Sequence, residues 1–387
     1  MLVATTVQSG APTHSGTPAD NDSALATLEG TRARTLALVS HLTADELEAV
    51  HSSIMGPLAW DLAHIAAYED LWLCHRQCHL ELLRPDLAEL YDAFETPRSQ
   101  RADEQSGFLD ANGARAYMEA VHHRASDALT REGIGDGTLF ELVVRHELQH
   151  TETMRQTMNI AGLLPRGGHP LLTLADANGP QWQEVRGGAF EMGATHDGFA
   201  YDNERPRHSE TLPAFAIARL PLTNGAWLRF HADGGYERRE LWSSEGWEWL
   251  HAREPAEREQ PRVSALESDP NACLCHVSYF EAQALAAAEG ARLPSEPEWE
   301  KAAGSSGRML TGAGLVWEWT SSDFTGYAGF RAHPYREYSE VFFDRGYKVL
   351  RGGSWATHEY VATPTFRNWD LPERRQIFAG VRLARDL

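Results

Sequence analysis

Apolar residues recur at helical spacing over the first part of the chain and predict a helical domain. In each run the apolar side chains return every three to four residues, so that one face of the helix is apolar. The runs cover residues 25–42, 58–78, 112–131 and 138–161. Four long helices with connections of mixed length are typical of a helical bundle. We therefore expect a four-helix bundle over residues 24–165.

The pattern changes after a linker rich in Pro and Gly at residues 166–180. Long helical periods give way to Trp, Gly and short alternating runs, and residues 187–193 predict a strand and a turn. Helices are expected at residues 278–289 and 295–303. An irregular α+β domain over residues 181–387 is therefore predicted, and the chain is a multidomain protein of α and α+β type.

The composition of the chain indicates which partners and which cellular location to expect. The chain carries 35 Lys plus Arg against 55 Asp plus Glu, a formal charge of -20 that repels phosphate backbones, so nucleic acid is not expected as a partner. No run of about 18 apolar residues exists, so no membrane span is expected. Residues 1–23 lack the basic start and apolar core of a signal peptide and predict a disordered tail. No feature indicates an obligate protein partner.

The four cysteines indicate a reducing, cytoplasmic setting. They are too few for a disulfide framework in a chain of 387 residues, and their spacing does not match an ordinary zinc knuckle. They are Cys74, Cys78, Cys273 and Cys275. Free cysteines are often buried as small apolar side chains, and we interpret these as packing thiols.

The segment His-Glu-Leu-Gln-His at residues 146–150 is the first candidate for chemistry. His146 and His150 are four residues apart, so on a helix they share one face and can bind one metal ion. Alone, this is the signature of a zinc protease with Glu147 as the general base. The metzincin form of that site needs a Gly and a His further on, where this chain has Thr153 and Gln156. The protease hypothesis thus lacks a third ligand downstream.

A third histidine lies upstream, in the segment Trp-Asp-Leu-Ala-His-Ile at residues 60–65. A bundle can bring His64 opposite His146 and His150. A site of three histidines with open positions suits iron(II) oxygen chemistry as well as zinc hydrolysis, so the ligands alone leave the metal open. The alternative is that all three are structural histidines.

These segments resemble the ergothioneine-biosynthesis sulfoxide synthases, including their selenoneine synthase branch. Residues 57–65, 69–73 and 146–154 match the amino-terminal domain of that family, a DinB-like metal-binding bundle. The second domain is similar to the formylglycine-generating-enzyme fold, a C-type-lectin-like variant. The matching stretches are residues 187–193, 292–300, 316–320, 349–355 and 380–383. True formylglycine-generating enzymes carry paired cysteines after the Gly-Gly-Ser segment. Residues 356–387 contain none, so that activity is not expected.

The resemblance implies a reaction and a cofactor. Members of the family use Fe(2+) and O2 to join a sulfur or selenium atom to the imidazole C2 of hercynine, which is N-trimethylhistidine. The implied iron ligands are His64, His146 and His150. Hercynine, a chalcogen donor and O2 are thus the expected substrates, and oxidative C–S or C–Se bond formation is the expected activity.

The resemblance also implies substrate-binding residues. Gln149 lies between two of the ligands and is expected on the hercynine side. Trp369 and Asp370 match the substrate-contacting loop of the family, and an aromatic face suits a trimethylammonium group through a cation–π interaction. Arg98 and Arg101 match a pair that binds the carboxylates of γ-glutamylcysteine.

A tyrosine near the iron acts as proton or hydrogen donor in the family. Tyr335 and Tyr338 fall in the matching region, with Tyr327 as a further candidate. Glu147 is expected to be a structural carboxylate rather than a base. The resemblance further implies a site between the two domains, because the ligands come from one domain and Trp369 from the other.

Two departures from the family bear on the donor. Thr151 stands where Asp is expected, and residues 102–105, after Arg101, lack the usual continuation rich in Pro and Leu. The second departure leaves a selenium donor such as a selenosugar open, and the overall resemblance slightly favours it, whereas Arg98 and Arg101 favour γ-glutamylcysteine. The alternative donor is γ-glutamylcysteine or cysteine. Two hypotheses of other classes stay open: a DinB-type zinc thiol-transferase or hydrolase, and a non-catalytic binding protein.

Overall fold

The computed structural model describes residues 20–92, 107–165, 180–254, 269–304 and 310–387. They group into two compact units, a helical one within residues 15–169 and a mixed one within residues 170–387. The short segment 197–199 groups with the helices.

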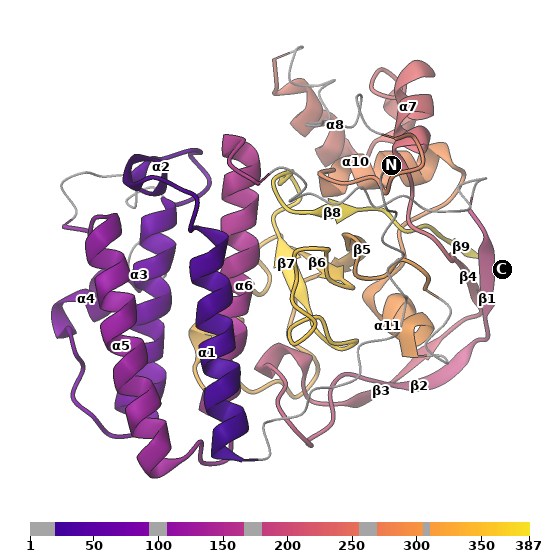
Figure 1. Ribbon diagram of the computed structural model, residues 1–387. Coiled ribbons are helices and arrows are strands. Elements are labelled where there is room, and N and C mark those ends of the chain that lie inside the picture. The colour runs from indigo at the N-terminus through magenta and orange to yellow at the C-terminus, as the bar shows by residue number, and fades with distance from the viewer. Residues whose placement is uncertain (1–19, 93–106, 166–179, 255–268, 305–309) are drawn as a thin grey trace, which may run out of the picture. The chain divides into compact units, whose positions relative to one another are not determined.

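The helical unit is built on four long helices, which confirms the predicted bundle. Helix α1 packs on α5 and α6, and α3 packs on the same two helices from another side (Figure 1). Its described elements are α1 (Asn21–Leu38), α2 (Ala44–Glu48), α3 (Leu58–Glu69), the π-helix η1 (Asp70–Gln77), α4 (Pro85–Leu90), α5 (Ala111–Glu132) and α6 (Thr138–Ala161).

Local capping explains where several of these helices begin. The side chain of Asp20 accepts a hydrogen bond from the backbone of Ser23, so α1 starts inside the stretch predicted as a disordered tail over residues 1–23. That tail is therefore too long by its last residues, and its first 19 lie outside the described residues. Thr43 and Glu46 form the capping box that starts α2.

Helix α3 forms the centre of the bundle. All its residues except Tyr68 are buried, as expected of a helix that is apolar all round and covered by neighbours. The predicted helix over residues 58–78 continues beyond Glu69 as a π-helix, in which the backbone N–H of Cys78 donates to the carbonyl of Leu73. Single π-helical segments are rare and often lie close to functional sites.

The mixed unit has the irregular α+β character that the sequence predicts. Its helices include α7 (Asn224–Ala232), α8 (Ser244–His251), α10 (Tyr279–Ala288) and α11 (Glu296–Gly304), and its 3-10 turns η2 (Asp202–Glu204), η3 (Arg239–Leu241), η5 (Arg336–Tyr338) and η6 (Glu340–Phe342). Helices α10 and α11 confirm the two helices predicted from residues 278–289 and 295–303. The linker predicted at residues 166–180 lies almost wholly outside the described residues.

The strands of the mixed unit are short and form small sheets. An antiparallel sheet has the order β1 (Trp182–Val185), β4 (Phe215–Ala218), β9 (Ala384–Asp386), and β2 (Gly188–Met192) pairs with β3 (His208–Leu212). A further sheet has the order β7 (Asn368–Asp370), β6 (Lys348–Arg351), β5 (Trp317–Asp323), β8 (Ala379–Gly380). In this last sheet β5 runs parallel to β8 and antiparallel to β6, and β7 forms one edge.

All four cysteines are free and buried, as the packing interpretation predicts. In the part of the chain that the structure describes, no helix combines the length and the apolar character needed to cross a membrane.

Candidate metal centre and substrate loop

Three histidines of the bundle meet in one place. His64 lies in α3, and His146 and His150 lie one turn apart on α6. Their ligand atoms are all within 4.8 Å of one another, and the Nε2 atoms of His64 and His146 are 3.1 Å apart. Two imidazoles in adjacent positions on one ion, each at about 2.1 Å, place their nitrogens about 3 Å apart. The three side chains thus fit a shared metal ion, which confirms the predicted ligand set as a metal site.

Hydrogen bonds at the far side of two rings orient them toward the centre. His64 donates from Nδ1 to the backbone carbonyl of Tyr91 at 2.6 Å, and His150 donates from Nδ1 to Oδ1 of Asp61 at 3.0 Å. In a neutral imidazole that donates from Nδ1, Nε2 carries the lone pair that can bind a metal. Asp61 is 4% exposed and lies three residues before His64 on α3. A buried carboxylate of this kind also makes the imidazole a stronger ligand.

Aromatic rings enclose the other side of the centre. Trp60 stacks on His64 with ring centroids 4.7 Å apart, and Tyr68 stacks on His146 at 3.6 Å. Burial lowers the pKa of His146 well below its usual value, and the neighbouring His150 and His64 lower it further. His146 is therefore neutral near pH 7, the form that binds a metal ion.

Glu147 does not face the histidine centre as a free base. It accepts hydrogen bonds from Nε and Nη2 of Arg32, both at 3.0 Å, and is 1% exposed. The interpretation of Glu147 as a structural carboxylate agrees with these contacts, and the protease hypothesis loses its base. Thr151, at the position where Asp was expected, donates its hydroxyl to the carbonyl of Leu148 within the same helix.

Of the remaining predicted residues of the bundle, the structure describes Gln149 but not the two arginines. Gln149 is half-buried on α6, directly before His150 and three residues after His146. Arg98 and Arg101 lie outside the described residues, so their role stays a prediction.

The predicted substrate loop forms the edge strand β7 of the mixed unit. Trp369 pairs with Val349 of β6, and its half-buried ring stacks on Phe324 with centroids 4.1 Å apart. Asp370 accepts hydrogen bonds from the side chain of Gln376 at 3.0 Å and from the backbone of Leu371 at 2.8 Å. Both residues are thus held in defined positions.

The candidate tyrosines lie at the two ends of the 3-10 turn η5, where Tyr335 is the residue before the turn and Tyr338 is its last residue. Tyr338 stacks on Tyr201 with centroids 4.3 Å apart, and its ring meets Trp369 edge-on at 5.9 Å. Tyr335 approaches the ring of Tyr338 at 6.3 Å. Tyr327 belongs to a different environment, because it donates to Glu296 at 3.5 Å and burial raises its pKa well above the usual value.

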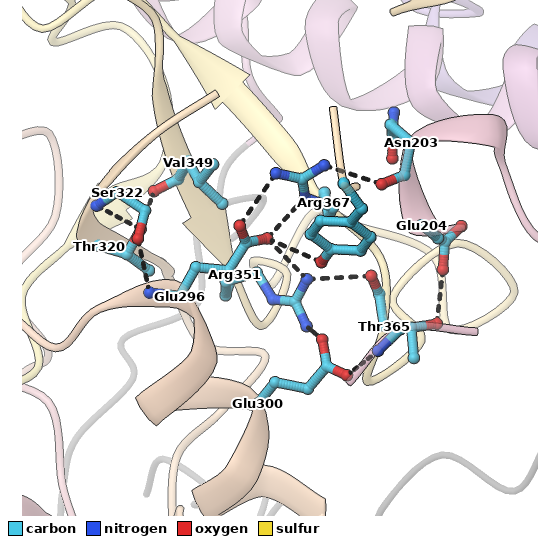
Figure 2. Close-up of polar contacts among 12 residues, drawn as sticks. Asn203, Glu204, Glu296, Glu300, Thr320, Ser322, Val349, Arg351, Thr365 and Arg367 are labelled. Atoms are coloured by element: carbon cyan, nitrogen blue, oxygen red, sulfur yellow. Dashed lines mark hydrogen bonds and ion pairs between the residues drawn. The ribbon is translucent and has the colours of Figure 1, made fainter. Parts of the chain in front are cut away.

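A buried network of charged side chains supports the chain that leads into β7. Figure 2 shows Glu296 between Arg351 and Arg367; it accepts from Arg367 at 2.7 and 3.0 Å and from Arg351 at 3.2 Å. Arg351 also bonds Glu300 at 2.5 Å. The two guanidinium groups donate to the backbone carbonyls of Pro364, Thr365, Asn203 and Thr325.

Comparison with known proteins identifies the family. Residues 27–154 match the DinB superfamily, and residues 173–313 and 309–387 match the Sulfatase-modifying factor enzyme 1-like domain. Hercynine oxygenase from Mycobacterium tuberculosis is 39% identical over 92% of this chain and 97% of its own length. The chain belongs to the hercynine oxygenase family. Hercynine oxygenase from Mycolicibacterium smegmatis is 38% identical over 92% of the chain and 97% of its own length.

More distant matches cover smaller parts of the chain. The formylglycine-generating enzyme of Streptomyces coelicolor is 31% identical over 32% of this chain and 47% of its own length. Among solved structures, PvdO from Pseudomonas aeruginosa covers 54% of this chain and 95% of its own length at 18% identity, with a TM-score of 0.36. The hercynine oxygenases and the two matching domain families confirm the family resemblance and both predicted domain types. The relatives support a sulfur donor, the alternative of the sequence analysis, better than the slightly favoured selenium donor.

Proposed function

We propose that this protein is an iron(II)- and O2-dependent hercynine oxygenase that forms a C–S bond at the imidazole C2 of hercynine. One observation carries the proposal: the three-histidine centre occurs in a chain that aligns with 97% of the length of a hercynine oxygenase. Three neutral imidazoles suit iron(II), which would supply open positions for a thiolate and O2 and the redox steps of the reaction. The sulfur donor is γ-glutamylcysteine or cysteine.

The residues of the chain then have distinct tasks. His64 and His150 keep their Nε2 atoms directed at the metal through hydrogen bonds from Nδ1. Trp369 offers the aromatic face that a trimethylammonium group prefers, and Phe324 keeps that ring in place by stacking on it. Asp370 and Gln149 supply the further contacts to hercynine that the family pattern implies.

Proton donation and the binding of the sulfur donor require other residues. Tyr338 is the better proton donor of the two predicted tyrosines, because its ring adjoins Trp369 whereas Tyr335 approaches Tyr338. Arg98 and Arg101 bind the carboxylates of the sulfur donor, as the family pattern implies.

The decisive experiment compares donors in one assay. The protein is loaded with iron(II) under anaerobic conditions and mixed with hercynine. Air-saturated buffer is then added in parallel with γ-glutamylcysteine, cysteine or a selenosugar, and the products are identified by mass spectrometry. A sulfoxide adduct of hercynine with one thiol is expected. A selenium adduct alone would contradict the sulfur donor.

A zinc hydrolase or thiol-transferase would use the same histidines but would need neither iron nor O2. Metal analysis after anaerobic purification, followed by assays with iron or zinc, separates the two functions. Activity is expected with iron and O2 only. Full activity with zinc in the absence of O2 would overturn the oxygenase proposal.

A further inference from the structure

A single guanidinium group joins the four long helices of the bundle. Arg32, on α1, is 4% exposed and donates to carboxylates on α3 and α6 and to a backbone carbonyl on α5. Its partners are Glu69 at 2.6 Å, Glu147 at 3.0 Å through both carboxylate oxygens, and the carbonyl of Met118 at 2.9 Å. Both carboxylates are almost wholly buried.

The two carboxylates lie on the helices that carry the histidines. Glu69 is the last residue of α3, five residues after His64, and Glu147 directly follows His146 on α6. Successive helical residues are turned by about 100°. While His146 faces the centre, Glu147 is therefore directed at Arg32. One guanidinium thus connects the ligand-bearing segments of α3 and α6.

The side chains around His64 on α3 are mostly small, at residues 62–67. Apolar packing of such side chains fixes the rotation of one helix against another only weakly. A guanidinium is planar and its N–H groups form a rigid fork, so a bidentate bond to Glu147 and a further bond to Glu69 fix directions as well as distance. A buried ion network of this kind is a weak source of stability, and apolar residues of similar volume often replace such networks without loss. Its clearest physical effect is therefore on geometry.

We propose that Arg32 is a positioning residue for the metal centre. It sets α3 against α6 so that His64 meets His146 and His150. The inference rests on the proposed metal-binding function, and it concerns how the bundle presents its ligands rather than which reaction follows.

The test compares metal binding with folding in the full-length protein. In the triple variant R32M/E69Q/E147Q the guanidinium and both carboxylates are replaced together, so none of these three buried charges is left without its partner. Cobalt(II) is titrated under anaerobic conditions, and both the dissociation constant and the visible absorption spectrum are recorded. We expect a secondary-structure content like that of the wild type, binding weaker by about 10- to 100-fold, and a changed spectrum.

A matched control removes another arginine of the same bundle. Arg124, on α5, bonds Asp70 at 3.3 Å directly after α3, and no contact of its side chain with α6 is among those the described residues show. R124M should lower the unfolding midpoint and leave the cobalt dissociation constant within about 2-fold. R32K keeps the charge without the fork, and weaker binding with a changed spectrum is expected.

The outcomes separate the inference from the function it rests on. If the wild type binds no divalent metal, the proposed function fails. If the wild type binds cobalt and the triple variant binds it equally well with the same spectrum, Arg32 is structural only and the inference is overturned. Should the triple variant not fold, R32K decides, because unchanged affinity and spectrum in that variant would equally overturn it.

Discussion

The helical and mixed units both bury arginine–glutamate networks, but the arginines have different partners. In the bundle, Arg32 bonds two carboxylates and a single backbone carbonyl. In the mixed unit, Arg351 and Arg367 also bond two carboxylates, Glu296 and Glu300, but in addition four backbone carbonyls. Figure 2 shows two of these bonds, from Arg351 to the carbonyl of Thr365 and from Arg367 to the carbonyl of Asn203.

The difference follows from secondary structure. A helix satisfies its own backbone groups, so a buried cation between helices is free to connect side chains. Short strands joined by long loops leave buried carbonyls that need other donors, because an unpaired buried polar group is costly. The arginines of the mixed unit supply those donors. The bundle network should therefore be dispensable for folding, and the loop network should not.

The largest expected effect is the difference in stability between a variant that neutralises the network of the mixed unit and one that neutralises the network of the bundle. The variant R351M/R367M/E296Q/E300Q leaves the four carbonyls without their donors, each at about 1–3 kcal/mol, a sum on the order of the whole stability of a domain. We expect the mixed unit to lose cooperative unfolding, measured by tryptophan fluorescence in urea, whereas R32M/E69Q/E147Q keeps a cooperative transition. Equal stability of the two variants would contradict the comparison.

The sequence predicts the bundle better than the mixed unit for the same physical reason. Four helices follow from apolar residues at regular spacing. The π-helix after Glu69 does not, because eight residues are too few to distinguish its period from that of an α-helix. Strand β7, with three residues, has no recognisable alternation, and Arg367, which directly precedes it, bonds Asn203 and Glu296, 164 and 71 residues away. Partners so far apart in sequence leave no local pattern.

Some residues of the candidate site follow from a local sequence pattern, and others do not. The spacing of His146 and His150 is a local pattern, and together with His64 in a predicted helix it indicates the ligands from the sequence alone. Asp61 was missed, although its place three residues before His64 puts it on the same helical face. Arg32 could not have been found, because 115 residues separate it from Glu147.

A second prediction uses two buried carboxylates, one from each unit, with opposite pKa shifts. Burial acts to raise the pKa of Glu69, but Arg32 and His122 outweigh it, and the pKa is lowered. Asp202, in the mixed unit, accepts from the Ser339 hydroxyl at 2.6 Å and from a backbone N–H. Burial raises its pKa to about 6. A carboxylate held by neutral donors thus stays protonated more easily.

The sign of the pH effect follows from that shift. Because the pKa of Asp202 is higher in the folded protein than in the unfolded chain, the protonated carboxyl stabilises the folded state. This contribution is complete below the unfolded pKa, near pH 4, and is lost as the pH rises through about 6. D202N cannot ionise. Relative to wild type, its free energy of unfolding should therefore increase between pH 4 and pH 8, by at most about 3 kcal/mol. Urea unfolding at several pH values measures this, and a constant difference would contradict it.

A third prediction concerns the histidine orientation in the bundle. D61A removes the acceptor for Nδ1 of His150 and should weaken iron(II) or cobalt(II) binding by about 10- to 100-fold. D61N keeps an acceptor oxygen without the charge, so a smaller loss is expected. D70N is the matched control, since Asp70 is equally buried but accepts from the backbone of Leu83 and from Arg124. If D61A and D70N bind metal alike, Asp61 has no orienting role.

The smallest effect is expected at Trp369, on the irregular side of the comparison. W369L removes the aromatic face proposed for the trimethylammonium group, whose cation–π interaction contributes about 0.5–2 kcal/mol, so KM for hercynine should rise by roughly 2- to 30-fold. W369F, which retains a ring to stack on Phe324, should show a smaller rise. Metal affinity should stay unchanged in both, because the ligands all lie in the bundle. A fall in kcat with no change in KM would instead mean that Trp369 supports Tyr338 rather than hercynine.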